Sequence, residues 1–236
     1  MNSIKKTAII VGVLFIIATV AGVVGNLSFS KPILDNPDYL INASANGNQV
    51  IIGALLLLIA AFAAASIAIW LYPILRKYNE GLALGAVGFR LIEGMLYVLA
   101  VIVLLSILTL SQEYVKAGAP DASLFQASGT SLLAVRDWAG KLSIIAFTLG
   151  ALMYYYVFYQ SKLVPRWLSG WGFLGAALSL AATLLAIFGQ IIYFSTVFIL
   201  LQLPIGVQEM VLAVWLIVKG FNPSAIASGS AKADMN

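Results

Sequence analysis

The stretch LALGAVGFRLIEGMLYVLAVIVLLSILTL, residues 82–110, decides the fold of this chain. Only two of its side chains, Arg90 and Glu93, are ionisable. A helix needs roughly 20 mostly apolar residues to cross the hydrocarbon core of a bilayer, which is about 30 Å thick. This stretch is longer than that, so we predict a transmembrane helix that carries two charged groups.

The rest of the chain has the same character. Of its 236 residues, 62% are hydrophobic and only 9% are charged, and the mean hydropathy is +1.01. A soluble domain carries about 25% charged residues, so soluble, disordered, collagen-like and secreted disulfide-rich classes are excluded. We predict an all-α polytopic integral membrane protein, a six-transmembrane-helix bundle. Its spans are expected at Ala8–Gly25, Val50–Tyr72, Leu82–Leu110, Gly129–Tyr159, Trp167–Phe188 and Ile191–Val218.

These spans form a single predicted transmembrane domain, residues 1–221, followed by a flexible cytoplasmic tail at 222–236. Lys5-Lys6 before an apolar run also fits a signal peptide, but the run is long and Ala21-Gly22-Val23 is a poor cleavage site. We therefore expect an uncleaved first helix.

Basic residues in the loops predict the orientation, because cytoplasmic loops are enriched in Lys and Arg. One side holds eight: Lys5, Lys6, Arg76, Lys77, Lys162, Arg166, Lys219 and Lys232. The other holds four: Lys31, Lys116, Arg136 and Lys141. Both termini are thus predicted in the cytoplasm of a cell whose plasma membrane the chain spans, with the loops at 26–49 and 111–128 outside.

The chain contains no Cys and no His. Thiol redox chemistry and Ser-His catalysis are therefore excluded, and we expect no metal and no cofactor. The net charge of +4 comes from scattered residues, so nucleic acid is not an expected partner. Membrane lipids are expected partners, and the sequence leaves the oligomeric state open.

Three ionisable groups lie inside predicted spans, where each costs about 2.5 to 3.5 kcal/mol on insertion scales and normally faces the protein interior. At about 1.5 Å per residue, Arg90, Glu93 and Glu209 lie roughly 14, 18 and 15 Å from the cytoplasmic edge. Arg90 and Glu93, spaced i and i+3, share one side of their helix. We therefore infer that the third and sixth spans meet and that Arg90 contacts Glu93 or Glu209.

Neighbouring positions extend this cluster. Tyr97 follows on the face of Glu93, and Gln202, Gly206, Glu209 and Ala213 form a stripe of small and polar residues on the sixth span. Such stripes allow close helix approach and interhelical hydrogen bonds. One Arg and two Glu leave a net charge of −1, which a proton on one Glu, a cation or a water-filled cavity would compensate.

Three interpretations of this set stay open. The Arg–Glu pair can simply fix helix packing, in a protein that assembles with partners. Arg90, Glu93, Tyr97, Gln202 and Glu209 can line a pocket between the third, fourth and sixth spans for an ion, lipid or small apolar molecule, in transport or sensing. Glu93 and Glu209 can also act as intramembrane acid and base. Binding is favoured over catalysis because no nucleophile or metal-ligand set accompanies the carboxylates, and no catalytic residue is assigned.

A second polar cluster, Arg136, Asp137, Trp138 and Lys141, leads into the fourth span near the outer interface. Asp137 and Lys141 are spaced i and i+4, a common helix pair. The favoured interpretation is an interfacial collar whose basic side chains reach toward the headgroups. The alternative is an outer gate above a cavity that reaches Glu93.

An ordered set of short motifs runs through nearly the whole chain: LYPIL at 71–75, GFRLIE at 88–93, RDW at 136–138, LVPRWL at 163–168, Gln208-Glu209 and VWLIVKG at 214–220. In these motifs the sequence resembles an uncharacterised bacterial and archaeal membrane family, domain of unknown function 4386. The resemblance implies a six-helix integral membrane protein and implies no substrate or functional residue.

Overall fold

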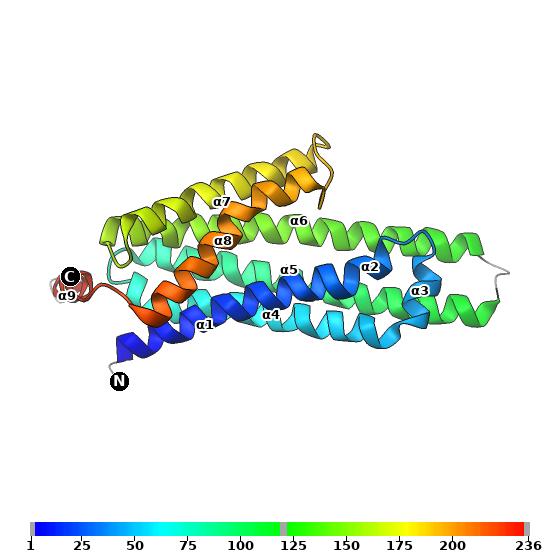
Figure 1. The fold of residues 1–236 in the computed structure, drawn as a ribbon, viewed down its shortest axis with the longest axis horizontal. Helices are drawn as coiled ribbons and strands as arrows, with labels where there is room; N and C mark the ends of the chain where they lie inside the picture. Colours follow the sequence, from blue (N-terminus) through cyan, green and yellow to red (C-terminus); the bar gives the residue numbers. More distant parts are fainter. Residues whose placement is uncertain (1–2, 119–121, 234–236) are drawn as a thin grey trace. The chain divides into compact units, whose positions relative to one another are not determined.

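The computed structural model describes residues 3–118 and 122–233, and this described part is helical with no β-strand (Figure 1). The long helices are α1 (Ser3–Val24), α4 (Gly47–Leu75), α5 (Glu80–Ala117), α6 (Ala122–Ser161), α7 (Arg166–Ile187) and α8 (Thr196–Val218). The short elements are the π-helix η1 (Gly25–Ser30), α2 (Lys31–Leu34), α3 (Tyr39–Ala45) and α9 (Pro223–Ala233).

Each of the six long helices is long and apolar enough to cross a membrane. At about 1.5 Å per residue, even α1 and α7, with 22 residues each, exceed the roughly 30 Å of a hydrocarbon core. This confirms the predicted all-α polytopic membrane protein with six transmembrane helices.

Two predicted loops are shorter than expected. The stretch 111–128 was predicted as a loop, but α5 continues to Ala117 and α6 begins at Ala122. Residues 111–117 are polar but contain no Gly or Pro, so nothing in them breaks the helix until Gly118, whose φ of +65° is left-handed. The stretch 26–49 likewise holds η1, α2 and α3, and Ser30 Oγ donates to the Gly25 carbonyl 2.9 Å away.

The predicted tail at 222–236 also contains a helix, α9, where flexible chain was expected; residues 234–236 lie outside the described part. Asn222 begins this helix by accepting at Oδ1 from the Ser224 amide, at 3.2 Å, and Pro223 suits the first helical position. Tyr78 Oη donates to the Ala225 carbonyl at 2.7 Å. Burial raises the pKa of Tyr78 above its ordinary value, and its hydrogen bond links α9 to the connection between α4 and α5.

The chain forms two compact units, and α1, α4, α5 and α6 each contribute a part to both. The first unit holds residues 1–17, 63–93 and 144–236. Within it, α7 and α8 lie side by side (Figure 1). A Cβ added at Gly175 would lie 3.0 Å from the backbone of Ile205, so this close approach requires a glycine. Ala182, Ala186 and Phe198 complete the α7–α8 core.

The second unit holds residues 18–62 and 94–143. Its core is mainly aliphatic and is built from α2, α3, α4 and α5, with Leu40, Leu57, Leu104 and Ile107 almost fully buried. Phe125 of α6 packs against this cluster. The second unit is therefore held by apolar packing, whereas most buried charged and amide side chains belong to the first unit.

Candidate functional site

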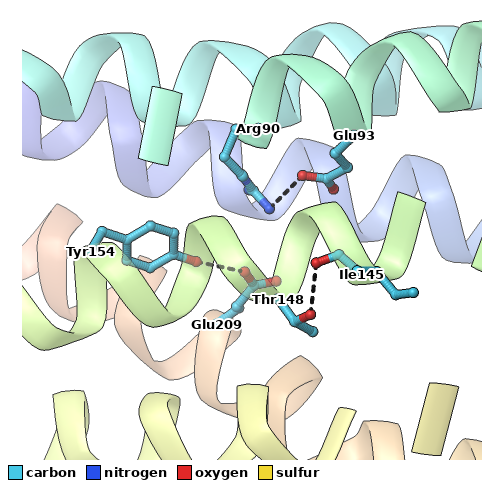
Figure 2. A network of polar contacts seen from close by, with 6 residues as sticks. All are labelled: Arg90, Glu93, Ile145, Thr148, Tyr154 and Glu209. Atoms are coloured by element: carbon cyan, nitrogen blue, oxygen red, sulfur yellow. Dashed lines mark hydrogen bonds and ion pairs between the residues drawn. The ribbon is translucent and has the colours of Figure 1, made fainter. Parts of the chain in front are cut away.

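Arg90 and Glu93 form a buried ion pair on α5, in the first unit. Arg90 is 2% exposed and Glu93 is 5% exposed. Arg90 Nη1 lies 3.0 Å from Glu93 Oε2 (Figure 2). Three residues of helix bring both side chains to one face, and the structure confirms the predicted contact between Arg90 and a buried glutamate.

Glu209 brings the second carboxylate to this unit from α8. It is 9% exposed, and Tyr154 Oη of α6 donates to its Oε1 at 3.4 Å (Figure 2). Arg90 interacts with Glu209 electrostatically, while its ion pair is with Glu93. The two carboxylates thus share one guanidinium unequally, because Glu93 makes the direct ion pair and Glu209 has a phenol as its hydrogen-bond donor.

Helix α6 also supports the arginine. The guanidinium carbon of Arg90 lies 5.1 Å from the centre of the Phe147 ring, within the range of a cation–π interaction. A Cβ added at Gly150 would lie 3.3 Å from Arg90 Cγ, so the glycine leaves room for the arginine stem beside α6. The aromatic face stabilises the buried positive charge without adding a negative one.

A second polar link joins α6, α7 and α8 next to this cluster. Tyr155 Oη donates to Gln208 Oε1, and Gln208 Nε2 donates to the Leu168 carbonyl at 2.9 Å. The Tyr155 ring occupies the space that a side chain at Gly172 would need. All three polar partners are fully buried, so this link fixes the rotation of α8 and thereby the direction of Glu209.

The sequence interpretation missed Tyr154, Tyr155 and Gln208. The run Tyr154-Tyr155-Tyr156 gives no pattern for a shared site, because three consecutive residues point to three sides of a helix. In the structure Tyr154 and Tyr155 are buried and Tyr156 is exposed. The available signal was the dipeptide Gln208-Glu209, because two polar residues in an apolar span need two partners.

The remaining predicted pocket residues are placed as follows. Gln202 lies on α8 of the first unit, and its Nε2 is buried with no hydrogen-bond partner among the described residues. Gly206, one turn further, has open space where a Cβ would point. Tyr97 packs against the apolar core of the second unit, and its place in a pocket stays a prediction.

The cluster has an excess of buried negative charge. If all three groups are ionised, one Arg and two Glu carry −1, and Arg90 Nε has no hydrogen-bond partner among the described residues. An uncompensated charge in a protein interior is costly. No group of three His, Cys, Asp or Glu residues gathers in the described ranges as it would around a metal ion. Since Glu93 takes the ion pair with Arg90, Glu209 is the carboxylate at which a proton or a small cation would neutralise the excess charge.

The predicted outer cluster belongs to the second unit. Arg136 Nη2 donates to Asn26 Oδ1 at 3.0 Å, a partner from outside the predicted set. Lys141 Nζ lies 4.8 Å from the centre of the Trp138 ring, and Asp137 is exposed beside Lys141 and Arg136. These contacts agree with a half-exposed collar; the outer-gate alternative stays a prediction.

Fold and site together define an integral membrane protein with six helical spans and a buried ion cluster of two glutamates and one arginine. The model of the family described as domain of unknown function (DUF4386) matches residues 10–220. The chain therefore belongs to this family, as its motifs suggested. No curated protein and no solved structure matches the chain.

Proposed function

We propose that this protein binds a small cation, in the simplest case a proton, at Glu209 and uses that binding in membrane transport or sensing. One observation carries the proposal: two buried glutamates face a single buried arginine, and the ion pair is made with Glu93. Among the described residues, the remaining carboxylate, Glu209, receives a long hydrogen bond from the Tyr154 phenol. A bound cation would cancel the excess charge of the cluster.

The same geometry speaks against the catalytic alternative. General acid–base catalysis needs a carboxylate within reach of both substrate and water. Glu93 and Glu209 expose only 5% and 9% of their surface, and Glu93 is held by Arg90. Ion binding requires only a narrow route to Glu209.

Melting temperatures of the purified protein test the proposal. Folding buries Glu209 in a negatively charged cluster, so the folded state should bind the cation more tightly than the unfolded state, and stability should fall as pH rises from about 5 to about 9. If sodium is the cation, NaCl should restore stability at high pH where choline chloride does not. Glu209→Gln mimics the neutral form of the glutamate, so it should remove the dependence of stability on both pH and sodium.

The matched control is Glu113→Gln, which neutralises an exposed glutamate of α5 and should keep the wild-type response. The proposal is wrong if Glu209→Gln responds to pH and sodium as the wild type does. Proteoliposomes with a pH-sensitive dye inside then separate transport, which changes the internal pH, from sensing, which does not.

We further propose that both termini face the cytoplasm and that the membrane is the plasma membrane, on the strength of the excess of basic residues beside one set of helix ends. Because the chain has no native cysteine, single cysteines report sidedness cleanly. Asn46→Cys, at an exposed position after α3, should react with an impermeant maleimide added outside intact cells. Lys5→Cys should react only after lysis; the reverse pattern would refute this orientation.

A further inference from the structure

A pocket of about 580 Å³ opens in the first unit between two connections, the one from α6 to α7 and the one from α8 to α9. Its wall carries three basic side chains, Lys162, Arg166 and Lys219. Trp215 and Pro223 provide apolar surface beside them. No carboxylate belongs to the described residues that line it, so the pocket presents positive charge over an apolar floor.

The two connections are fastened to each other. The Asn222 amide donates to the Leu163 carbonyl at 2.9 Å, and Asn222 Nδ2 donates to the Lys162 carbonyl at 3.3 Å. Leu163 and Val164, which also line the pocket, are almost fully buried. These hydrogen bonds hold the two connections that form the pocket against each other.

The charges in this pocket favour an anion with several oxygens. Lys162, Arg166 and Lys219 are exposed, so their charges lie at the protein surface. Arg166 also donates from Nε to the Tyr159 carbonyl at 3.4 Å. Helix α7 begins at Arg166, and the preceding residue, Pro165, has no side-chain group that can cap it. The positive end of the α7 dipole adds to the three cations, as it does at phosphate sites.

The position of the pocket indicates which kind of molecule carries that anion. The spans of α6, α7 and α8 end or begin at Ser161, Arg166 and Val218, so the pocket lies at the boundary of the hydrocarbon region. Trp215 packs edge-to-face on Trp167, with ring centres 6.5 Å apart, and tryptophan prefers this interfacial level. We propose that the pocket binds the phosphate headgroup of an anionic phospholipid, whose acyl chains lie along the adjoining apolar helices.

The test compares three proteins in a neutral detergent: the wild type, Lys162→Gln/Arg166→Gln/Lys219→Gln, and a matched control, Lys5→Gln/Lys6→Gln/Arg76→Gln. The control removes the same charge from exposed residues outside the pocket. Melting temperature is measured while dioleoylphosphatidylglycerol, dioleoylphosphatidylcholine or inorganic phosphate is added. Each protein is compared with itself without additive, so a difference in stability between the variants does not affect the measured shift in melting temperature.

Phosphatidylglycerol should stabilise the wild type and the control, and phosphatidylcholine should not. The pocket variant should need at least about tenfold more phosphatidylglycerol for the same shift, because each basic residue contributes to the attraction of anionic lipid. An equal response of both triple variants would overturn the proposal in favour of non-specific charge. Inorganic phosphate acting as strongly as the lipid would overturn it in favour of a soluble phosphate ligand. If the pocket variant does not fold, Lys162→Gln/Lys219→Gln takes its place.

Discussion

Arg90 and Arg136 lie on consecutive helices, α5 and α6, of an apolar chain, but the two arginines have opposite surroundings. Arg90, in the first unit, is 2% exposed and contacts a carboxylate at 3.0 Å and an aromatic ring. Arg136, in the second unit, is half-buried, and its Nη2 donates to the neutral amide oxygen of Asn26. The exposed Asp137 lies next to it in the chain.

The difference shows how burial determines the partner that an arginine needs. A guanidinium removed from water requires a full negative charge close by, since a polar neutral group cannot offset its desolvation. A guanidinium that keeps part of its hydration needs only a hydrogen bond to hold its direction. The stability of the cluster around Arg90 therefore depends on the protonation of Glu93 and Glu209, whereas the hydrogen bond from Arg136 to Asn26 involves no ionisable partner.

Replacement of Arg90 should have the largest effect. Arg90→Met leaves two buried carboxylates with no cation, and the loss typical of a broken buried pair is about 3–5 kcal/mol. We expect most of this loss to be recovered in Arg90→Met/Glu93→Gln/Glu209→Gln, because the amides remove the uncompensated charge. Chemical unfolding in detergent measures both.

This prediction fails if Arg90→Met is as stable as the wild type, or if the triple variant is no better than the single one. The triple variant also separates folding from function. A protein that folds again without regaining ligand binding or the cellular phenotype would assign the cluster a functional role, and recovery of both would leave it only a packing role.

Arg136 should have an intermediate effect. Arg136→Met removes a partly buried, charge-assisted hydrogen bond to Asn26, so the expected loss is about 1–2 kcal/mol. Asn26→Ala should cost a similar amount, and the double variant little more than either, because both delete one interaction. Simple addition of the two losses would show that Arg136 and Asn26 act independently. A loss as large as that of Arg90→Met would remove the contrast between the two arginines.

The transmembrane architecture could be predicted from the sequence because membrane insertion depends mainly on composition and segment length. The i, i+3 pair of Arg90 and Glu93 was equally accessible, since helix geometry alone brings these side chains together. The ends of the helices could not be predicted in this way. Residues 111–117 and α9 contain polar residues that a hydropathy profile assigns to loops, although such residues do not terminate a helix.

The hydrogen-bond partners that come from other helices could not be predicted from the sequence either. The hydrogen bond from Tyr154 to Glu209 joins residues 55 positions apart, and that from Arg136 to Asn26 joins residues 110 apart. Each depends on the rotation of two helices about their axes. In the first unit Gly150, Gly172 and Gly175 allow close contacts with α5, Tyr155 and α8, and glycine positions alone do not reveal which helix comes close.

The smallest effect is expected from exchanging Asp137 and Lys141. Asp137 is exposed, and exposed i, i+4 ion pairs contribute about 0.3–0.5 kcal/mol. Asp137→Lys/Lys141→Asp keeps both charges and their spacing, and it gives up the contact between Lys141 and the Trp138 ring, itself about 0.5–1 kcal/mol at an exposed site. The double variant should therefore melt within a few degrees of the wild type in detergent, and Trp138→Leu alone should lose as much. A loss several times larger, comparable with that of Arg136→Met, would mean that these side chains serve the interior of the protein, and the outer-gate interpretation would then replace the collar.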